Sequence, residues 1–156
     1  MRRFDRSGSL ALAALIALAF TSVGARAAPV KDVFEKYNLM GTWAWDCSKP
    51  PDARSNWVFV NRLVDANHVQ RDFMKNATER GWYSFITEAT ALGPTEVHVV
   101  GTRNGQPTDG IWRVEGGRMV QWQASQAGKK IITDGHYVAG NGGQIPSLNK
   151  CGTPGK

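Results

Sequence analysis

The chain has 156 residues, with 19 basic and 13 acidic side chains and a formal net charge of +6 at pH 7. Residues 1–27 hold four of the arginines and one aspartate, so 15 basic and 12 acidic side chains remain in residues 28–156, a net charge of +3. These charges are spread along the sequence, which excludes the concentrated basic surface of a nucleic-acid-binding protein.

The first 27 residues have the organisation of a cleavable secretory signal peptide. A basic stretch at residues 2–6 precedes an apolar run over residues 10–23, and residues 25–27 supply an Ala-Arg-Ala cleavage site. A membrane-spanning helix needs roughly 20 apolar residues, so we expect no membrane span after cleavage. Arg2-Arg3 leaves a twin-arginine export signal open beside the ordinary secretory route. The mature protein is expected to begin at Ala28 and to be periplasmic or secreted.

Residues 28–156 are predicted to form a single domain, long enough to bury a core. Its two cysteines, Cys47 and Cys151, lie near its ends. In an oxidising compartment the pair is expected to form a disulfide, which has one possible intramolecular connectivity. The chain-entropy model gives about 4 to 5 kcal/mol, as an upper figure, for closing a loop of roughly 100 residues. A redox pair or half of a metal site is the alternative, and the sequence has no C-x-x-C spacing to favour it.

A short amphipathic helix is predicted over residues 30–39, because Val30, Val33, Phe34 and Tyr37 recur at helical spacing. After Gly41 this periodicity disappears. Short segments rich in aromatic and β-branched residues then alternate with turn residues, a pattern typical of a sandwich or a barrel. The eight predicted strands cover residues 41–47, 56–64, 68–75, 81–90, 96–103, 109–114, 118–125 and 129–138.

The turns between these segments indicate how the strands pair. Asn104-Gly105 and Gly116-Gly117 allow the positive backbone angles of tight hairpins, so consecutive strands should be neighbours. No later segment is a helix long enough to cross between parallel strands. We therefore predict an all-β fold, an eight-stranded antiparallel up-and-down barrel whose closure removes exposed edges. Residues 139–156 are predicted to be a terminal strap that Cys151 holds against the end of the first strand.

The predicted helix followed by Gly41-Thr42-Trp43 resembles the G-x-W signature of lipocalins and related calycin barrels. The resemblance implies that a helical turn closes one end of the barrel and that the tryptophan packs over it. It also implies a basic side chain from the last strand against this tryptophan, for which Lys129 or Lys130 is the candidate.

Two further resemblances bear on function. Residues 41–44, 46–50, 134–136 and 148–152 together are similar to a group of small exported bacterial proteins, which supports the disulfide and the barrel without implying an activity. The chain also resembles periplasmic inhibitors of secreted metalloproteases. That likeness implies an extracytoplasmic protein partner, with Ala28, Pro29 and Val30 entering a protease cleft.

The mature chain is rich in tryptophan, with six residues of this type. They either line a cavity for an apolar or aromatic ligand or fill the barrel as bulky core side chains. Trp43 is expected to be structural. The residues predicted to bind a ligand are Trp82, Tyr83, Trp112 and Trp122.

The titratable residues show no pattern of a catalytic or metal site. His68, His98 and His136 lie on three predicted strands, where surface positions are expected and convergence on zinc or haem iron is the alternative. Asp134 and His136 share a strand face, as in a base oriented by a carboxylate, yet Asp134-Gly135 is also typical of a turn.

The sequence therefore predicts no catalytic residue, no metal and no cofactor. It favours a non-enzymatic exported barrel that binds a small, largely apolar molecule. An exported inhibitor of a secreted hydrolase, or an envelope module that contacts another protein, is the alternative.

Overall fold

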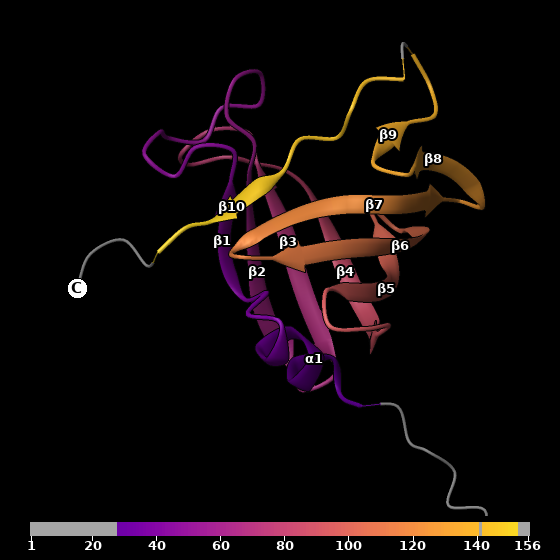
Figure 1. Cartoon of the computed structure of the whole chain (residues 1–156). Helices are drawn as coiled ribbons and strands as arrows, with labels where there is room; N and C mark the ends of the chain where they lie inside the picture. Colours follow the sequence, from indigo (N-terminus) through magenta and orange to yellow (C-terminus); the bar gives the residue numbers. More distant parts are fainter. Residues whose placement is uncertain (1–27, 141, 153–156) are drawn as a thin grey trace, which may run out of the picture.

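The computed structural model describes residues 28–140 and 142–152, so the predicted signal peptide lies outside the described residues. A short helix, α1 (Val30–Lys36), precedes ten strands that belong to one antiparallel sheet (Figure 1). No helix in the described ranges has the length and apolar character to cross a membrane. The strands are β1 (Gly41–Ala44), β2 (Val58–Asp65), β3 (His68–Met74), β4 (Arg80–Ala91), β5 (Glu96–Arg103), β6 (Gln106–Glu115), β7 (Arg118–Gln126), β8 (Lys129–Thr133), β9 (His136–Tyr137) and β10 (Leu148–Lys150).

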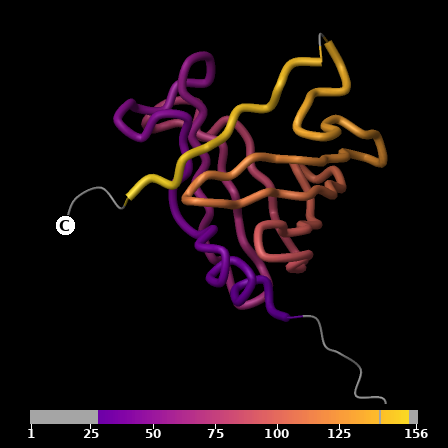
Figure 2. Tube along the Cα trace, viewed as in Figure 1, coloured from indigo at the N-terminus to yellow at the C-terminus, as the bar shows by residue number. Residues whose placement is uncertain are grey.

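The sheet closes into a barrel through its last strand. β1 to β7 pair in chain order, and β10 pairs antiparallel with both β1 and β7. In the tube view the yellow carboxyl-terminal chain runs beside the indigo start of the barrel and the orange β7 (Figure 2). These eight strands form a closed antiparallel barrel, which confirms the fold predicted from the sequence.

The strand that closes the barrel is not the predicted one. Residues 129–138 form the β8–β9 hairpin, and β8 pairs with β7 at Ala124, Ser125 and Gln126. Asp134 and Gly135, both with positive φ, turn the chain back before it reaches β1. β10 takes the free amino-terminal end of β7, where Leu148 is the partner of Met119. The predicted terminal strap thus contains the eighth barrel strand.

One end of the barrel is filled by α1 and the turn that follows it. Phe34 of the helix lies edge-on to Trp112, with 5.9 Å between ring centroids. Trp43 is buried, and its indole N–H donates to the Leu39 carbonyl at 2.9 Å. The Asn61 amide donates to the same carbonyl at 2.6 Å. Two buried side chains therefore satisfy the Leu39 carbonyl, which lies at this end of the barrel. Trp43 is structural, as expected.

The basic side chain beside Trp43 comes from β10. The Lys150 ammonium lies 5.1 Å from the Trp43 ring centroid, and burial lowers the pKa of Lys150. Lys129 and Lys130 are exposed on β8. The expectation for these two lysines is wrong because β8 never reaches the first strand, whereas β10 pairs with it directly.

The predicted disulfide is confirmed. Cys47 and Cys151 are bonded, with their Cα atoms 5.4 Å apart. The bond joins the segment after β1 to the residue after β10. Because β10 is only three residues long, this covalent link holds a strand that has few hydrogen bonds of its own.

Candidate functional site

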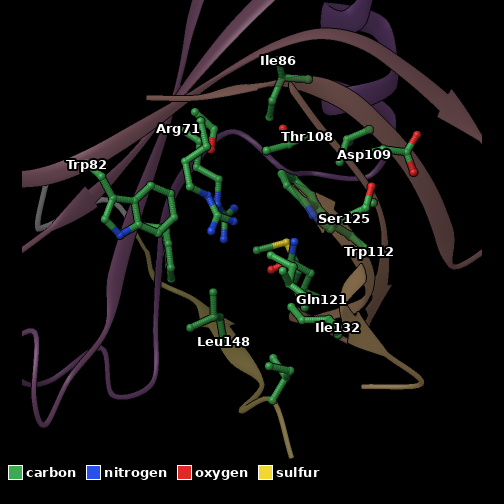
Figure 3. A pocket seen from close by; sticks show the side chains of 18 of the residues that line it. Arg71, Trp82, Ile86, Thr108, Asp109, Trp112, Gln121, Ser125, Ile132 and Leu148 are labelled. Atoms are coloured by element: carbon green, nitrogen blue, oxygen red, sulfur yellow. The ribbon is translucent and has the colours of Figure 1, made fainter. Parts of the chain in front are cut away.

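A cavity lies between the barrel interior and the segment that contains the β8–β9 hairpin. Its volume is about 280 Å³, and its lining includes inward side chains of β2 to β7 together with Ile131, Tyr137 and Ile145 from the hairpin segment. Ligand pockets in proteins span about 300 to 1,000 Å³, so this cavity suits a small ligand. Figure 3 shows apolar and aromatic side chains converging on it from several strands.

Aromatic side chains on three neighbouring strands form a cluster in which Phe59 and Trp82 line the cavity and Phe73 packs against both. Phe59, Phe73 and Trp82 are successive cross-strand partners on β2, β3 and β4. The Trp82 ring stacks on Phe73 with 5.3 Å between centroids and meets Phe59 edge-on at 5.6 Å. Such contacts between facing positions fix the orientation of the rings. Trp82 is therefore a rigid part of the wall.

Arg71 is the charged residue at the centre of the site. It lies on β3 between Val69 and Phe73, points inward, and is only 8% exposed. Its guanidinium carbon is 4.2 Å from the Phe59 ring centroid and 4.6 Å from that of Trp112, so the group is held between two aromatic rings. Its Nη1 donates to the neutral Asn61 Oδ1 at 3.3 Å. Figure 3 shows Arg71 directed into the cavity.

A second arginine, Arg103, lines the same cavity from the end of β5. Its guanidinium carbon lies 4.5 Å from the Trp82 ring centroid, and its Nη1 donates to Gln126 Oε1 at 3.5 Å. Its Nε is buried and has no hydrogen-bond partner within the part of the chain that the structure describes. Both neighbours of the guanidinium are neutral, so its charge is not compensated by them.

The two arginines make the cavity electropositive. Burial lowers the pKa of Arg71 to about 9, and the positive charge of Arg103 acts in the same direction. Burial also lowers the pKa of Arg103. Arg71 nevertheless stays a cation at neutral pH. Between residues 28 and 152, position 141 aside, none of the ion pairs includes Arg71 or Arg103.

The acidic groups that border the cavity do not neutralise these cations. Asp109 borders it, but its side chain is 58% exposed and lies 2.8 Å from His98 Nε2. Figure 3 shows Asp109 turned away from Arg71. Burial raises the pKa of Tyr137, and Arg103 opposes the shift, so this phenol is uncharged at neutral pH. Buried charges in proteins are usually paired. The buried Arg71 departs from that rule, and so does the half-buried Arg103.

The four residues predicted to bind a ligand divide between the two faces of the wall. Trp82 and Trp112 line the cavity. Tyr83 is exposed beneath the Arg80 guanidinium, because neighbouring strand residues point to opposite faces. Trp122 lies under Arg113, whose guanidinium carbon is 3.5 Å from the ring centroid, and is not part of the lining. Ligand binding by Trp82 and Trp112 stays a prediction.

Arg71 and Arg103 were not among the residues predicted from the sequence. The signal was the alternation within their strands. Arg71 belongs to the same inward set as Val69 and Phe73, and Arg103 follows Val97 and Val99 at strand spacing. A charged residue in an otherwise apolar alternating set is the pattern that marks such a site.

The histidines lie apart, each with its own partner. His68 Nδ1 is 2.7 Å from Asp65, and His136 Nδ1 is 2.8 Å from the carbonyl oxygen of Asp134. Asp134-Gly135 forms the turn between β8 and β9, as one of the two sequence interpretations held. Within the described ranges, no group of three or more His, Cys, Asp or Glu side chains is placed to hold a metal ion.

The amino-terminal residues differ in their accessibility. Ala28 and Pro29 are exposed. Val30 is 3% exposed and belongs to the core beneath α1. Of the three residues suggested to enter a protease cleft, Val30 is therefore committed to the barrel.

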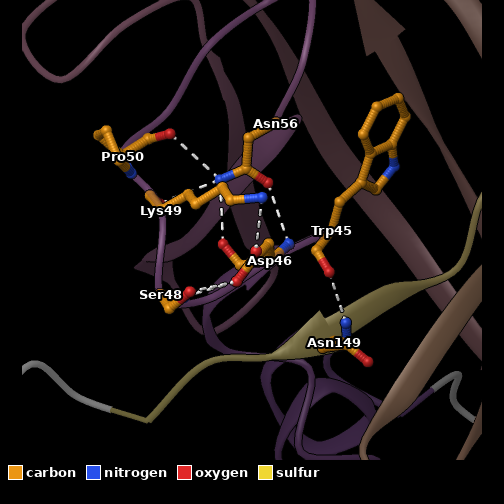
Figure 4. A network of polar contacts seen from close by, with 7 residues as sticks. All are labelled: Trp45, Asp46, Ser48, Lys49, Pro50, Asn56 and Asn149. Carbon is orange, nitrogen blue, oxygen red and sulfur yellow. Dashed lines mark hydrogen bonds and ion pairs between the residues drawn. The ribbon is translucent and has the colours of Figure 1, made fainter.

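A polar network links the segment after β1 to the segment before β2 and to β10 (Figure 4). The buried Asn56 amide donates to the carbonyls of Asp46, Lys49 and Pro50, and its Oδ1 accepts from the Asp46 backbone N–H. Asn149 of β10 donates to the Trp45 carbonyl at 2.7 Å. Residues 46–50 and 148–152, two of the segments named for their similarity to exported proteins, thus lie side by side and are joined by the disulfide.

The same network orders an exposed carboxylate. Hydrogen bonds from the hydroxyl and backbone N–H of Ser48, with Lys49 nearby, lower the pKa of Asp46 to about 2. Next to it, Trp45 stacks on Trp57 with 5.0 Å between centroids, and Trp57 borders the cavity. A series of contacts therefore links β10, through Trp45 and Trp57, to the lining of the cavity.

Comparison with protein-family models, with curated proteins and with solved structures finds no match for the chain. The resemblance to lipocalin-like barrels therefore stays a prediction.

Proposed function

We propose that the chain is a non-enzymatic, exported binding protein that holds a small, largely apolar molecule inside its barrel. The observation that carries the proposal is the cavity of about 280 Å³ with Phe59, Trp82 and Trp112 in its walls. Rigid aromatic walls with a few polar groups are the usual features of small-molecule sites. The disulfide supports a location outside the cytoplasm, where such bonds form and persist.

The three histidines are placed apart from the proposed binding cavity. The three histidines each pair with an aspartate or its backbone, at separate places on the barrel. A general base has to lie within hydrogen-bond reach of the proton that it removes. None of the three is among the residues that line the cavity.

The test is a titration of the purified protein with a panel of small apolar and aromatic compounds, followed by intrinsic tryptophan emission and by melting temperature. We expect at least one class of compound to quench emission and raise the melting temperature. Trp82→Leu should weaken binding about tenfold or more, since it removes part of the aromatic wall. Trp122→Leu is the matched control and should bind normally, because Trp122 packs outside the cavity.

A panel that changes neither emission nor melting temperature would exclude the binding function. Equal weakening by both tryptophan variants would place the ligand somewhere other than the cavity.

A further inference from the structure

We infer that the cavity binds small amphipathic anions, whose apolar body lies against the aromatic wall and whose planar acidic head group, of the carboxylate type, is held by Arg71 and Arg103. The inference rests on the proposed binding function and specifies the chemical class of the ligand. It follows from the way in which these two arginines are buried.

Arg71 has unused hydrogen-bonding capacity. A guanidinium has five N–H donors, and the described partner of Arg71 is one neutral oxygen at 3.3 Å. The side chain is more than nine-tenths buried and lines the cavity. A buried charge is costly unless a counter-charge is hydrogen-bonded to it. The remaining donors of Arg71 therefore suit an anion that enters the cavity.

Another cation lies in the same space. Arg103 is close enough for its charge to act on Arg71, and its buried Nε has no partner among the residues of known placement. Two like charges repel each other, and an anion that contacts both offsets the repulsion. One acidic head group bound to both side chains would accept hydrogen bonds from several of the free donors.

The orientation of Arg71 limits the shape of the head group. The rings of Phe59 and Trp112 hold the Arg71 guanidinium in a fixed orientation. A fixed planar guanidinium matches the two oxygens of a carboxylate, to which it donates two parallel hydrogen bonds. The aromatic rings beside it, including Trp82, offer an apolar surface for the rest of the ligand.

The size of the cavity limits the body of the ligand. A volume of about 280 Å³ lies near the lower end of the range for ligand pockets, so we expect a single ring or a short chain on the acid. Phenylacetate and octanoate are suitable probes. Their neutral amides, phenylacetamide and octanamide, have almost the same shape without the charge.

The experiment is isothermal titration calorimetry of the intact, disulfide-bonded protein with the two acids, the two amides and inorganic phosphate. We expect each acid to bind at least tenfold more tightly than its amide, because hydrogen bonds to charged groups are the stronger ones. Arg71→Met should reduce the affinity for the acids at least tenfold and leave the affinity for the amides nearly unchanged. Arg103→Met should have the same effect in the same direction.

Arg113→Met is the matched control. Arg113 also stacks on a tryptophan, but it lies on the outer face, paired with Glu96 at 2.6 Å. Its removal should leave acid binding unchanged. The melting temperature of the ligand-free Arg71→Met protein should equal or exceed that of the unsubstituted protein, since an unpaired buried charge is removed. A fall of more than about 5 °C would assign Arg71 a structural role and overturn the inference.

The remaining outcomes separate the inference from the proposed function. If amides bind as tightly as acids, the protein binds apolar ligands but the anionic head group is wrong. If phosphate alone binds as tightly as the acids, the site takes small anions and the apolar body is wrong. If none of the probes binds, the inference fails, and the wider panel of apolar and aromatic compounds decides the proposed function separately. The comparison of acids with amides uses the unsubstituted protein, so it decides the question even where a variant does not fold.

Discussion

Two adjacent residues of β3, Arg71 and Asp72, are both buried and charged, but they differ in how their charges are compensated. Asp72 points to the outer face of the barrel, where its carboxylate accepts hydrogen bonds from Arg62, from Arg80 Nη1 at 3.2 Å and from Gln70 Nε2 at 2.8 Å. Arg71 points inward and has one neutral hydrogen-bond partner. The outer charge is compensated within the chain, and the inner one is not.

The difference shows which buried charge lowers the stability of the fold. On the outer face, two arginines that are half exposed neutralise a carboxylate with no exposed surface. On the inner face, aromatic rings replace the counter-ion, and they offset only part of the cost of burying a cation. Natural proteins tolerate such local costs mainly at functional sites. The inner face of β3 is therefore the face to which we assign the proposed binding function.

The largest expected effect on stability comes from opening the barrel, so that water reaches its inner face. Reduction of the Cys47–Cys151 disulfide releases β10, which pairs with each neighbour through only two residue pairs. We expect the free energy of unfolding to fall by up to about 5 kcal/mol, since the bond closes a loop of roughly 100 residues. Water would then reach Arg71 as freely as the outer arginines, and ligand binding should be lost.

Denaturant unfolding with and without reductant measures this effect. The chain has only these two cysteines, so the reductant acts at one bond. Equal unfolding midpoints for the oxidised and reduced proteins would contradict the role given to the disulfide. The double variant Cys47→Ser, Cys151→Ser controls for effects of the reductant on the assay.

The closing strand also shows the limit of sequence analysis for the fold. The barrel could be predicted because strand alternation and turn residues are local properties, and the first seven barrel strands carry both. β10 could not, because Leu148, Asn149 and Lys150 carry no recognisable pattern in a segment rich in Gly, Asn and Pro. They form a strand only because β1 and β7 offer two free edges and the disulfide holds them there.

The site was predictable in part for a similar reason. Trp82 and Trp112 could be proposed from their size and from the excess of tryptophan. Arg71 and Arg103 could not be proposed with the same ease, because a charged residue within an apolar strand usually lies at the surface. The register between neighbouring strands decides which side chains point inward. The register between β6 and β7 shifts at Ile111 and Trp112, so that Trp122 has no partner on β6 there. Such shifts are properties of the sheet, and the sequence of one strand does not contain them.

A smaller effect is expected from Asp72→Asn, which removes the compensated charge. We expect the protein to lose about 2 kcal/mol of stability, less than for a pair buried on both sides, because Arg62 and Arg80 return to water. Chemical unfolding at neutral pH measures the loss. Binding of small acids should not change, since Asp72 faces away from the cavity.

The pH dependence of the same variant checks the cause. Burial raises the pKa of Asp72, but the hydrogen bonds from Gln70, Arg62 and Arg80 outweigh burial and hold the pKa below its ordinary value of 3.8. A carboxyl whose pKa is lower in the folded state stabilises the protein above pH 3.8, and the contribution is lost as the pH falls through the folded value. The stability of Asp72→Asn should therefore fall less steeply below pH 4 than that of the unsubstituted protein. Parallel acid profiles would show that Asp72 is not the group responsible.

The smallest effect is expected from Glu96→Gln, also on the outer face. Glu96 pairs with Arg113 at 2.6 Å, but both side chains are partly exposed, at 32% and 42%. Exposed pairs of this kind contribute about 0.2 to 1 kcal/mol, since water and salt screen them. We expect a loss below 1 kcal/mol by chemical unfolding, and a smaller loss at high salt. If Glu96→Gln and Asp72→Asn lose the same stability, the contribution of each carboxylate depends on its ion pair and not on its burial. The expected difference between the two carboxylates would instead show that burial sets the cost of a charge in this barrel, and Arg71 is the cation for which that cost is highest.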